Sequence, residues 1–132
     1  MRILVGTAVT LCVVIGAASS LAAHHSFSAE YDINKPVAFQ GVVTKVEWTN
    51  PHARIYVDVS DAKGAVTNWN LELASPSALN RNGWSSRTLK VGDKVKVDGF
   101  EGRAAKTFRL NAKSIILPDG RSLFSGSVDD AR

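Results

Sequence analysis

The stretch that decides the fold is 53–60, ARIYVDVS, in which apolar and polar residues alternate strictly. One face carries Ala53, Ile55, Val57 and Val59, and the other carries Arg54, Tyr56 and Asp58. A period of two is typical of an antiparallel strand with one side buried and the other wet. This stretch therefore predicts a β-strand that covers an apolar core.

The neighbouring stretches have the same character. The loop DAKG at 61–64 leads into 66–73, VTNWNLEL, where Trp69 shares a face with two leucines. That spacing predicts a hairpin. Upstream, 37–48 (VAFQGVVTKVEW) is rich in β-branched and aromatic residues, and Gly41 predicts a bulge or tight bend in a long strand. A turn at 49–51 separates this strand from the next.

A short helix is predicted after the third strand. Ser75 is a natural N-cap, Pro76 suits the first helical position, and Gly83 suits the position after the last turn. Two more strands are expected within 89–100 and 108–117. The pair Asp119-Gly120 then predicts a hairpin into a short strand ending at Phe124.

Three strands, one helix and two strands is the order of a small five-stranded Greek-key barrel, the OB-fold. We therefore predict an all-β, OB-fold-like domain at 37–124, with the short helix between strands 3 and 4. A plain antiparallel sandwich is the competing architecture. An extended arm at 24–36 and a frayed polar tail at 125–132 complete the chain. The length of 132 residues suits one domain.

Residues 1–23 have a positive start, an apolar middle and small residues at the end, as in a secretory signal peptide. An uncleaved membrane anchor is the alternative. Cleavage after Ala22 and cleavage after Ala23 both fit. We expect a periplasmic or secreted protein with no integral membrane association after cleavage. Because Cys12 is the only cysteine and leaves with this segment, the mature protein has no disulfide or thiolate chemistry.

The three histidines are the candidate metal ligands: His24 and His25 at the cut, and His52 in the loop between the first two strands. A cut after Ala22 places His25 third, where amine, two backbone amides and imidazole form a square of nitrogens that suits Cu(II). A cut after Ala23 gives His24 an amine and an imidazole, and His52 is the histidine that remains for a third nitrogen. The competing interpretation is that these histidines are simply solvated.

Loops between strands 1 and 2 carry ligands in OB-folds, and exposed aromatics stack on bases and sugars. We therefore predict a ligand-binding face at Asn50, Arg54, Tyr56 and Trp84, with Trp84 expected to be exposed. Such a face would take an oligosaccharide or an envelope protein partner. Core packing is the alternative for each tryptophan.

Charge and motifs argue against other classes. The net charge is +4, and without Arg2 the mature chain has 15 basic and 12 acidic residues, or +3. Basic residues gather at 94–113, but an exported protein does not meet nucleic acid, so we expect a solvated face and no nucleic acid partner. No Gly-rich phosphate loop, G-x-S-x-G elbow or nucleophilic cysteine is present. We expect a binding protein rather than an enzyme.

Four strings resemble a family of small exported bacterial proteins, the domain-of-unknown-function family 6152. They are HHSF (24–27), AEYD (29–32), EWTNPHARIYVDV (47–59) and NWNLEL (68–73). The resemblance implies an exported single domain and carries no established activity. In the family, a small-x-Ala motif stands directly before HH, whereas this chain has Leu21-Ala22-Ala23. The position of His24 in the mature chain stays open on this ground too.

Overall fold

The computed structural model describes residues 27–126. Residues 27–30 are helical and are grouped apart from the compact unit that begins at Tyr31. The predicted signal peptide, its cleavage point and both His24 and His25 lie outside the described residues. Within 27–126, no helix is long and apolar enough to cross a membrane.

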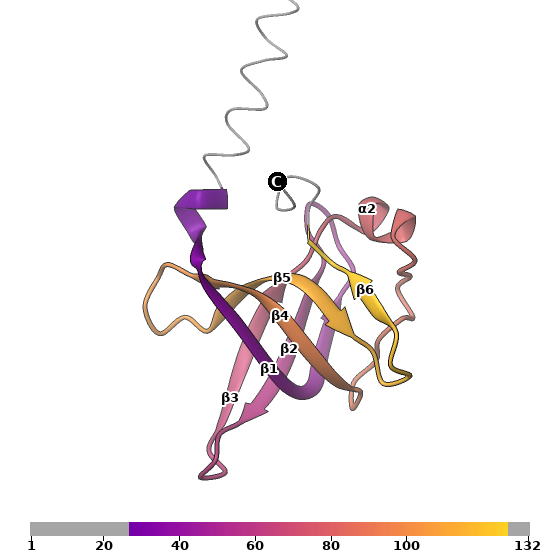
Figure 1. Ribbon diagram of the computed structural model, residues 1–132. Helices are drawn as coiled ribbons and strands as arrows, with labels where there is room; N and C mark the ends of the chain where they lie inside the picture. The colour runs from indigo at the N-terminus through magenta and orange to yellow at the C-terminus, as the bar shows by residue number, and fades with distance from the viewer. Residues whose placement is uncertain (1–26, 127–132) are drawn as a thin grey trace, which may run out of the picture. The chain divides into compact units, whose positions relative to one another are not determined.

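From Tyr31 onward the chain is mostly β-structure, which confirms the all-β class. Six strands and one helix follow in order: β1 (Tyr31–Glu47), β2 (Arg54–Ser60), β3 (Val66–Glu72), α2 (Pro76–Arg81), β4 (Lys94–Gly102), β5 (Arg109–Ile116) and β6 (Ser122–Phe124). Figure 1 shows the long β1 crossing the sheet, and the helix lies between β3 and β4 in the chain as predicted.

The strands form one sheet in the order β3-β2-β1-β4-β5-β6, with neighbours antiparallel. An additional parallel pairing joins Asn70–Glu72 of β3 to Arg109–Asn111 of β5. This pairing joins the first strand of the order, β3, to the last but one, β5. Strand β6 is the short strand predicted after the Asp119-Gly120 hairpin; it pairs with β5 and is additional to the five strands of the predicted barrel.

Strand β1 begins at Tyr31, six residues before the start predicted at Val37. Its first part pairs with β4 and its last part with β2. The bulge predicted at Gly41 is displaced, because the irregularity lies between Val43 and Lys45. Gly41 has a different role: a Cβ there would lie 2.5 Å from the carbonyl oxygen of Asp58. Only glycine permits so close an approach of two backbones.

The helix α2 confirms the predicted signals. The hydroxyl of Ser75 accepts a hydrogen bond from the backbone N–H of Ala78 at 3.3 Å, and Pro76 opens the helix. Gly83, just beyond the C-cap, has a φ of +88°, which a side chain would disfavour. The helix thus begins and ends where its local sequence dictates.

The core lies on the face that the alternating residues predict. The fully buried side chains include Val57, Leu71, Leu79, Leu110 and Ile115. The sequence places Ser125 and Gly126 in a frayed tail, but both are buried. The backbone N–H groups of both donate to the carbonyl of Lys113, and the Ser125 hydroxyl donates to Ala112. These two residues are held beside β5 because their polar groups find partners there.

Candidate functional site

His52 stands in the loop between β1 and β2, with its imidazole partly buried. Nδ1 lies 3.0 Å from the carbonyl oxygen of Leu73. A carbonyl only accepts, so Nδ1 carries a proton, and the lone pair of a neutral imidazole with this tautomer lies on Nε2. Among residues 27–126, this is the one hydrogen bond of the ring. Metal-binding histidines are oriented in this way, by a hydrogen bond from the nitrogen that does not bind the metal.

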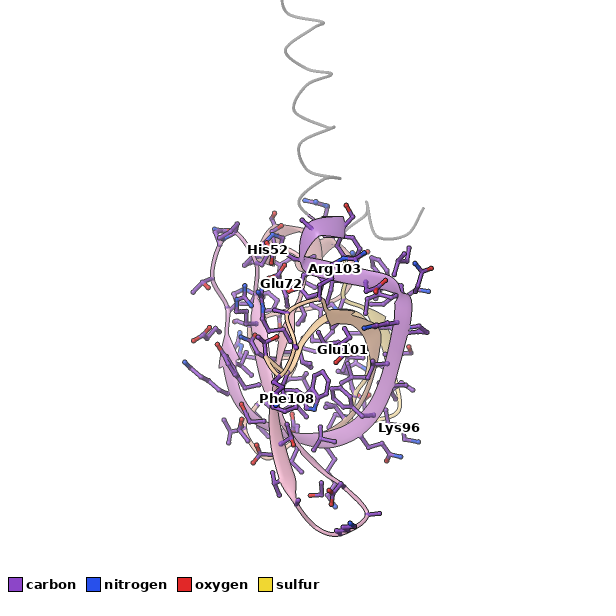
Figure 2. The ribbon with its side chains drawn as sticks, turned by 90° about the vertical axis from the view of Figure 1, so that its left-hand side faces the viewer. His52, Glu72, Lys96, Glu101, Arg103 and Phe108 are labelled. Atoms are coloured by element: carbon purple, nitrogen blue, oxygen red, sulfur yellow. The ribbon has the colours of Figure 1, made fainter. Side chains whose placement is uncertain are left out.

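Beside His52 lies a group of three charged side chains and one tyrosine that we call the Glu72 network: Tyr31, Arg54, Glu72 and Arg109. Arg54 Nη2 is 2.7 Å from Glu72 Oε2, and Arg109 Nη2 is 3.5 Å from the same oxygen. Arg109 also donates to the Tyr31 hydroxyl at 3.1 Å. The network joins β1, β2, β3 and β5 around one carboxylate, and Figure 2 shows Glu72 near His52.

Tyr31 is the buried member of the network, with 2% of its surface exposed. Burial, reinforced by the negative charge of Glu72, raises the pKa of Tyr31 to about 12. The guanidinium of Arg109 acts in the opposite direction without cancelling this effect. The hydroxyl therefore stays protonated through the physiological range and serves as a hydrogen-bonding tie between strands.

The predicted ligand-binding residues of β2 do lie together on its outward face. Arg54 is half-buried and also donates to Asn70 at 3.2 Å. Tyr56 donates from its hydroxyl to Glu47 at 3.4 Å. Glu47 also pairs with Lys45 at 2.5 Å, which lowers the pKa of that carboxyl. Both β2 side chains thus have protein partners.

Asn50 is exposed in the same loop as His52 and is joined to Pro51 by a cis peptide bond. It lies two residues before His52 in the chain. The residue is exposed between β1 and β2, which agrees with its predicted position in a loop.

The expectation that Trp84 is exposed is wrong. Only 3% of its surface is accessible, and it belongs to the apolar core with Leu79 and Leu89. Its indole N–H donates to the carbonyl of Phe124 at 2.9 Å. A buried indole needs such an acceptor, and β6 supplies it. Trp84 therefore packs the helix against the sheet and offers no stacking surface.

Exposed aromatic surface lies elsewhere. Trp69 is half-buried, with ring centroids 5.1 Å from Phe39 and 5.7 Å from Phe108. Phe108 is 44% exposed and has a φ of +48°, an unusual conformation for a residue with a side chain. The predicted core role of Trp69 is confirmed in part, since the side chain is only partly buried but packs against the buried core residues.

Sequence reasoning missed Tyr31, Glu72 and Arg109. The sequence does carry a signal for Glu72. The alternation in β3 places it on the outward face, and the β2–β3 pairing places it opposite Arg54, which predicts an ion pair. Within the described residues, no three His, Cys, Asp or Glu side chains gather closely enough to hold a metal ion. The described part of the chain thus supplies one candidate metal ligand, His52, and a satisfied charge network beside it.

The sequence matches the family of unknown function DUF6152 over residues 11–111. The chain belongs to this family. The match confirms the resemblance carried by the HHSF, AEYD, TNPHA and NWNLEL strings. No curated protein and no solved structure matches the chain. Membership of DUF6152 therefore assigns no chemistry, and the function has to be argued from the residues.

Proposed function

We propose that this DUF6152 protein is exported to the periplasm or beyond, where it binds a small ligand without catalysing a reaction. We further propose that its sheet is an OB-fold-like barrel of five strands, with β6 as an addition. The strand pairing β1-β2-β3-β5-β4 and the helix between β3 and β4 support this proposal. In such a barrel, the loop that carries Asn50 and His52 is a ligand-binding loop.

The ligand we propose is Cu(II), held by the mature N-terminus with His24 and His25, and with His52 as a further ligand in protein that begins at His24. The observation that carries the proposal is the Nδ1 hydrogen bond of His52, since it leaves Nε2 with its lone pair. Either cleavage point leaves a set of nitrogen ligands that suits Cu(II). A cut after Ala22 provides four nitrogens from the first three residues alone, and a cut after Ala23 requires the third imidazole.

The test is a titration of the exported, processed protein with Cu(II), followed by visible absorption and electron paramagnetic resonance. Intact mass first establishes the amino terminus. We expect one Cu(II) per chain, with nitrogen ligands. His24→Ala plus His25→Ala should lower the affinity at least 100-fold. His52→Ala should weaken binding only in protein that begins at His24. Unchanged affinity in the double variant would refute the copper proposal.

The outward face of β2 favours a second candidate, an oligosaccharide or an envelope protein partner. Arg54 and Tyr56 lie side by side on this face, both partly exposed, and a guanidinium next to a phenol is a common recognition pair. Binding that survives removal of residues 24–30 but is lost on Arg54→Ala plus Tyr56→Ala would favour this candidate over copper.

A further inference from the structure

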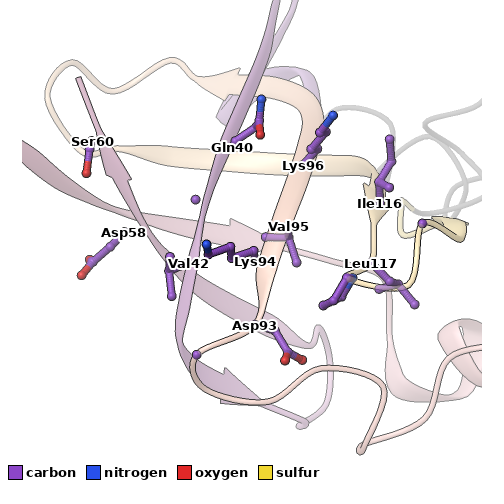
Figure 3. Close-up of a pocket in the computed structure, with 14 residues that line it drawn as sticks. Gln40, Val42, Asp58, Ser60, Asp93, Lys94, Val95, Lys96, Ile116 and Leu117 are labelled. Atoms are coloured by element: carbon purple, nitrogen blue, oxygen red, sulfur yellow. The ribbon is translucent and has the colours of Figure 1, made fainter. Parts of the chain in front are cut away.

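A groove lies on the sheet and shares no residue with the Glu72 network or with His52. Strands β1 and β2 stop pairing at Val42 and Asp58, and a hollow of about 790 Å³ opens there between β1, β2, β4 and the end of β5. A second hollow of about 520 Å³ adjoins it, and the two share Gln40, Ser60, Lys96 and Ile116. We call this the Lys94–Lys96 groove (Figure 3). Its volume is that of a small-molecule site.

The groove exposes apolar side chains that the fold does not need there. Val42 is 38% exposed and Ile116 is 37% exposed, and both line the larger hollow. Phe39 and Val59, which face the interior, line the smaller one. Apolar surface therefore runs from the outside of the sheet towards the core, and a bound apolar group would remove it from water.

Two positive charges stand beside this apolar surface. Lys94 and Lys96 lie on the same side of β4, roughly 7 Å apart along the strand. Their cross-strand neighbours Val42, Gln40 and Ile116 carry no charge. In the part of the chain that the structure describes, neither ammonium has an ion-pair or hydrogen-bond partner.

Three carboxylates also line the groove, and each accepts a hydrogen bond from elsewhere in the protein. Asp58 accepts from the Asn68 amide at 2.7 Å, and Asp98 accepts from the Ser114 hydroxyl. Asp93 accepts from the backbone N–H of Lys90 at 3.0 Å and lies 3.5 Å from its ammonium. Asp58 and Asp98 keep their negative charge, because an amide and a hydroxyl are neutral donors, but neither carboxylate forms an ion pair with Lys94 or Lys96. Within the described residues, the two ammoniums are therefore left for a ligand.

We infer that the Lys94–Lys96 groove binds a single-chain amphipathic anion, whose acyl chain covers Val42 and Ile116. Its head group pairs with one of the two ammoniums, which extend in different directions in Figure 3. The two unpaired ammoniums favour a negatively charged head group, and the apolar hollow favours a hydrocarbon chain as the rest of the ligand. The site shares no residue with the proposed copper ligands, so each can fail while the other stands.

The test is calorimetric titration of the exported, processed protein with dodecanoate below its micelle concentration. Dodecyl maltoside provides the same chain with a neutral head. We expect one dodecanoate per chain, bound at least 10-fold more tightly than the maltoside. Lys94→Gln plus Lys96→Gln should weaken dodecanoate binding about 10-fold, which corresponds to about 1.4 kcal/mol. Ile116→Asp should weaken it further, because it adds a negative charge to the apolar wall.

The matched control is Lys63→Gln plus Lys106→Gln, which removes the same charge from two exposed lysines outside the groove. It should leave dodecanoate affinity within twofold of wild type. Equal losses in both double variants would overturn the inference, because they would report net charge rather than a site. So would absence of dodecanoate binding, or binding only to anionic phospholipid vesicles.

Discussion

In the Glu72 network two guanidiniums share one carboxylate, whereas in the Lys94–Lys96 groove two ammoniums have no partner in the described residues. Both regions are built on strands of the same sheet. In the first, a buried tyrosine and paired charges tie four strands together. In the second, the charges stand beside exposed apolar side chains. The contrast teaches that charged side chains have two uses in this protein. Those of the Glu72 network stabilise the fold, and Lys94 and Lys96 serve the ligand binding that we infer.

The largest expected effect on this contrast is that of Glu72→Gln. It removes the charge that two arginines share, with only 12% of the Glu72 side chain exposed. Leaving guanidiniums partly buried without a counter-charge should lower the free energy of unfolding by about 2–3 kcal/mol. Urea denaturation measures it. Glu101→Gln, also half-buried but without an ion pair in the described residues, is the control and should change little.

Tyr31→Phe gives the next effect, and it depends on pH. The pKa of Tyr31 is raised in the folded protein to about 12 from the ordinary value of 10.0, so its contribution is complete below pH 10. As pH rises from 10 to 12, the unfolded chain loses the proton first and stability falls. Wild type should therefore lose roughly 1–2 kcal/mol more than Tyr31→Phe over this window. If the free energy of unfolding of the two proteins fell equally between pH 10 and 12, the pKa of Tyr31 would not be raised by folding, and the account of this hydroxyl would be wrong.

The smallest expected effect is that of Lys94→Gln plus Lys96→Gln on stability. The two ammoniums have no partners to lose in the described residues, so the free energy of unfolding should change by less than about 0.5 kcal/mol. Their effect should appear in ligand binding instead. A loss of 2 kcal/mol or more in urea denaturation would place these lysines in the structural class of Glu72 and remove the contrast.

Local patterns predicted most of the strands and the helix. Alternation identified β2 and β3, because each buries one face, and Ser75, Pro76 and Gly83 located α2 through caps that act within a few residues. The start of β1 was missed because its pairing with β4 shifts register between Tyr31 and Pro36, which interrupts the period of two.

The site was less predictable, because its decisive contacts join distant parts of the chain. The acceptor of the Trp84 indole lies 40 residues away, and Tyr31 and Arg109 are 78 residues apart. No local pattern carries such pairings. By contrast, the outward parity of Arg54 and Tyr56 followed from the alternation at 53–60, and the loop position of His52 followed from the turn at 49–51. The groove depends on where β1 and β2 stop pairing, a tertiary feature.

The copper proposal is tested most directly by electron paramagnetic resonance of the processed protein with one equivalent of Cu(II), before and after His24→Ala plus His25→Ala. We expect a single Cu(II) species with nitrogen hyperfine structure in wild type and its loss in the double variant. In protein that begins at His24, His52→Ala should remove one nitrogen, because its Nε2 is then a ligand. An identical spectrum and affinity in the wild type and the double variant would contradict the proposed function.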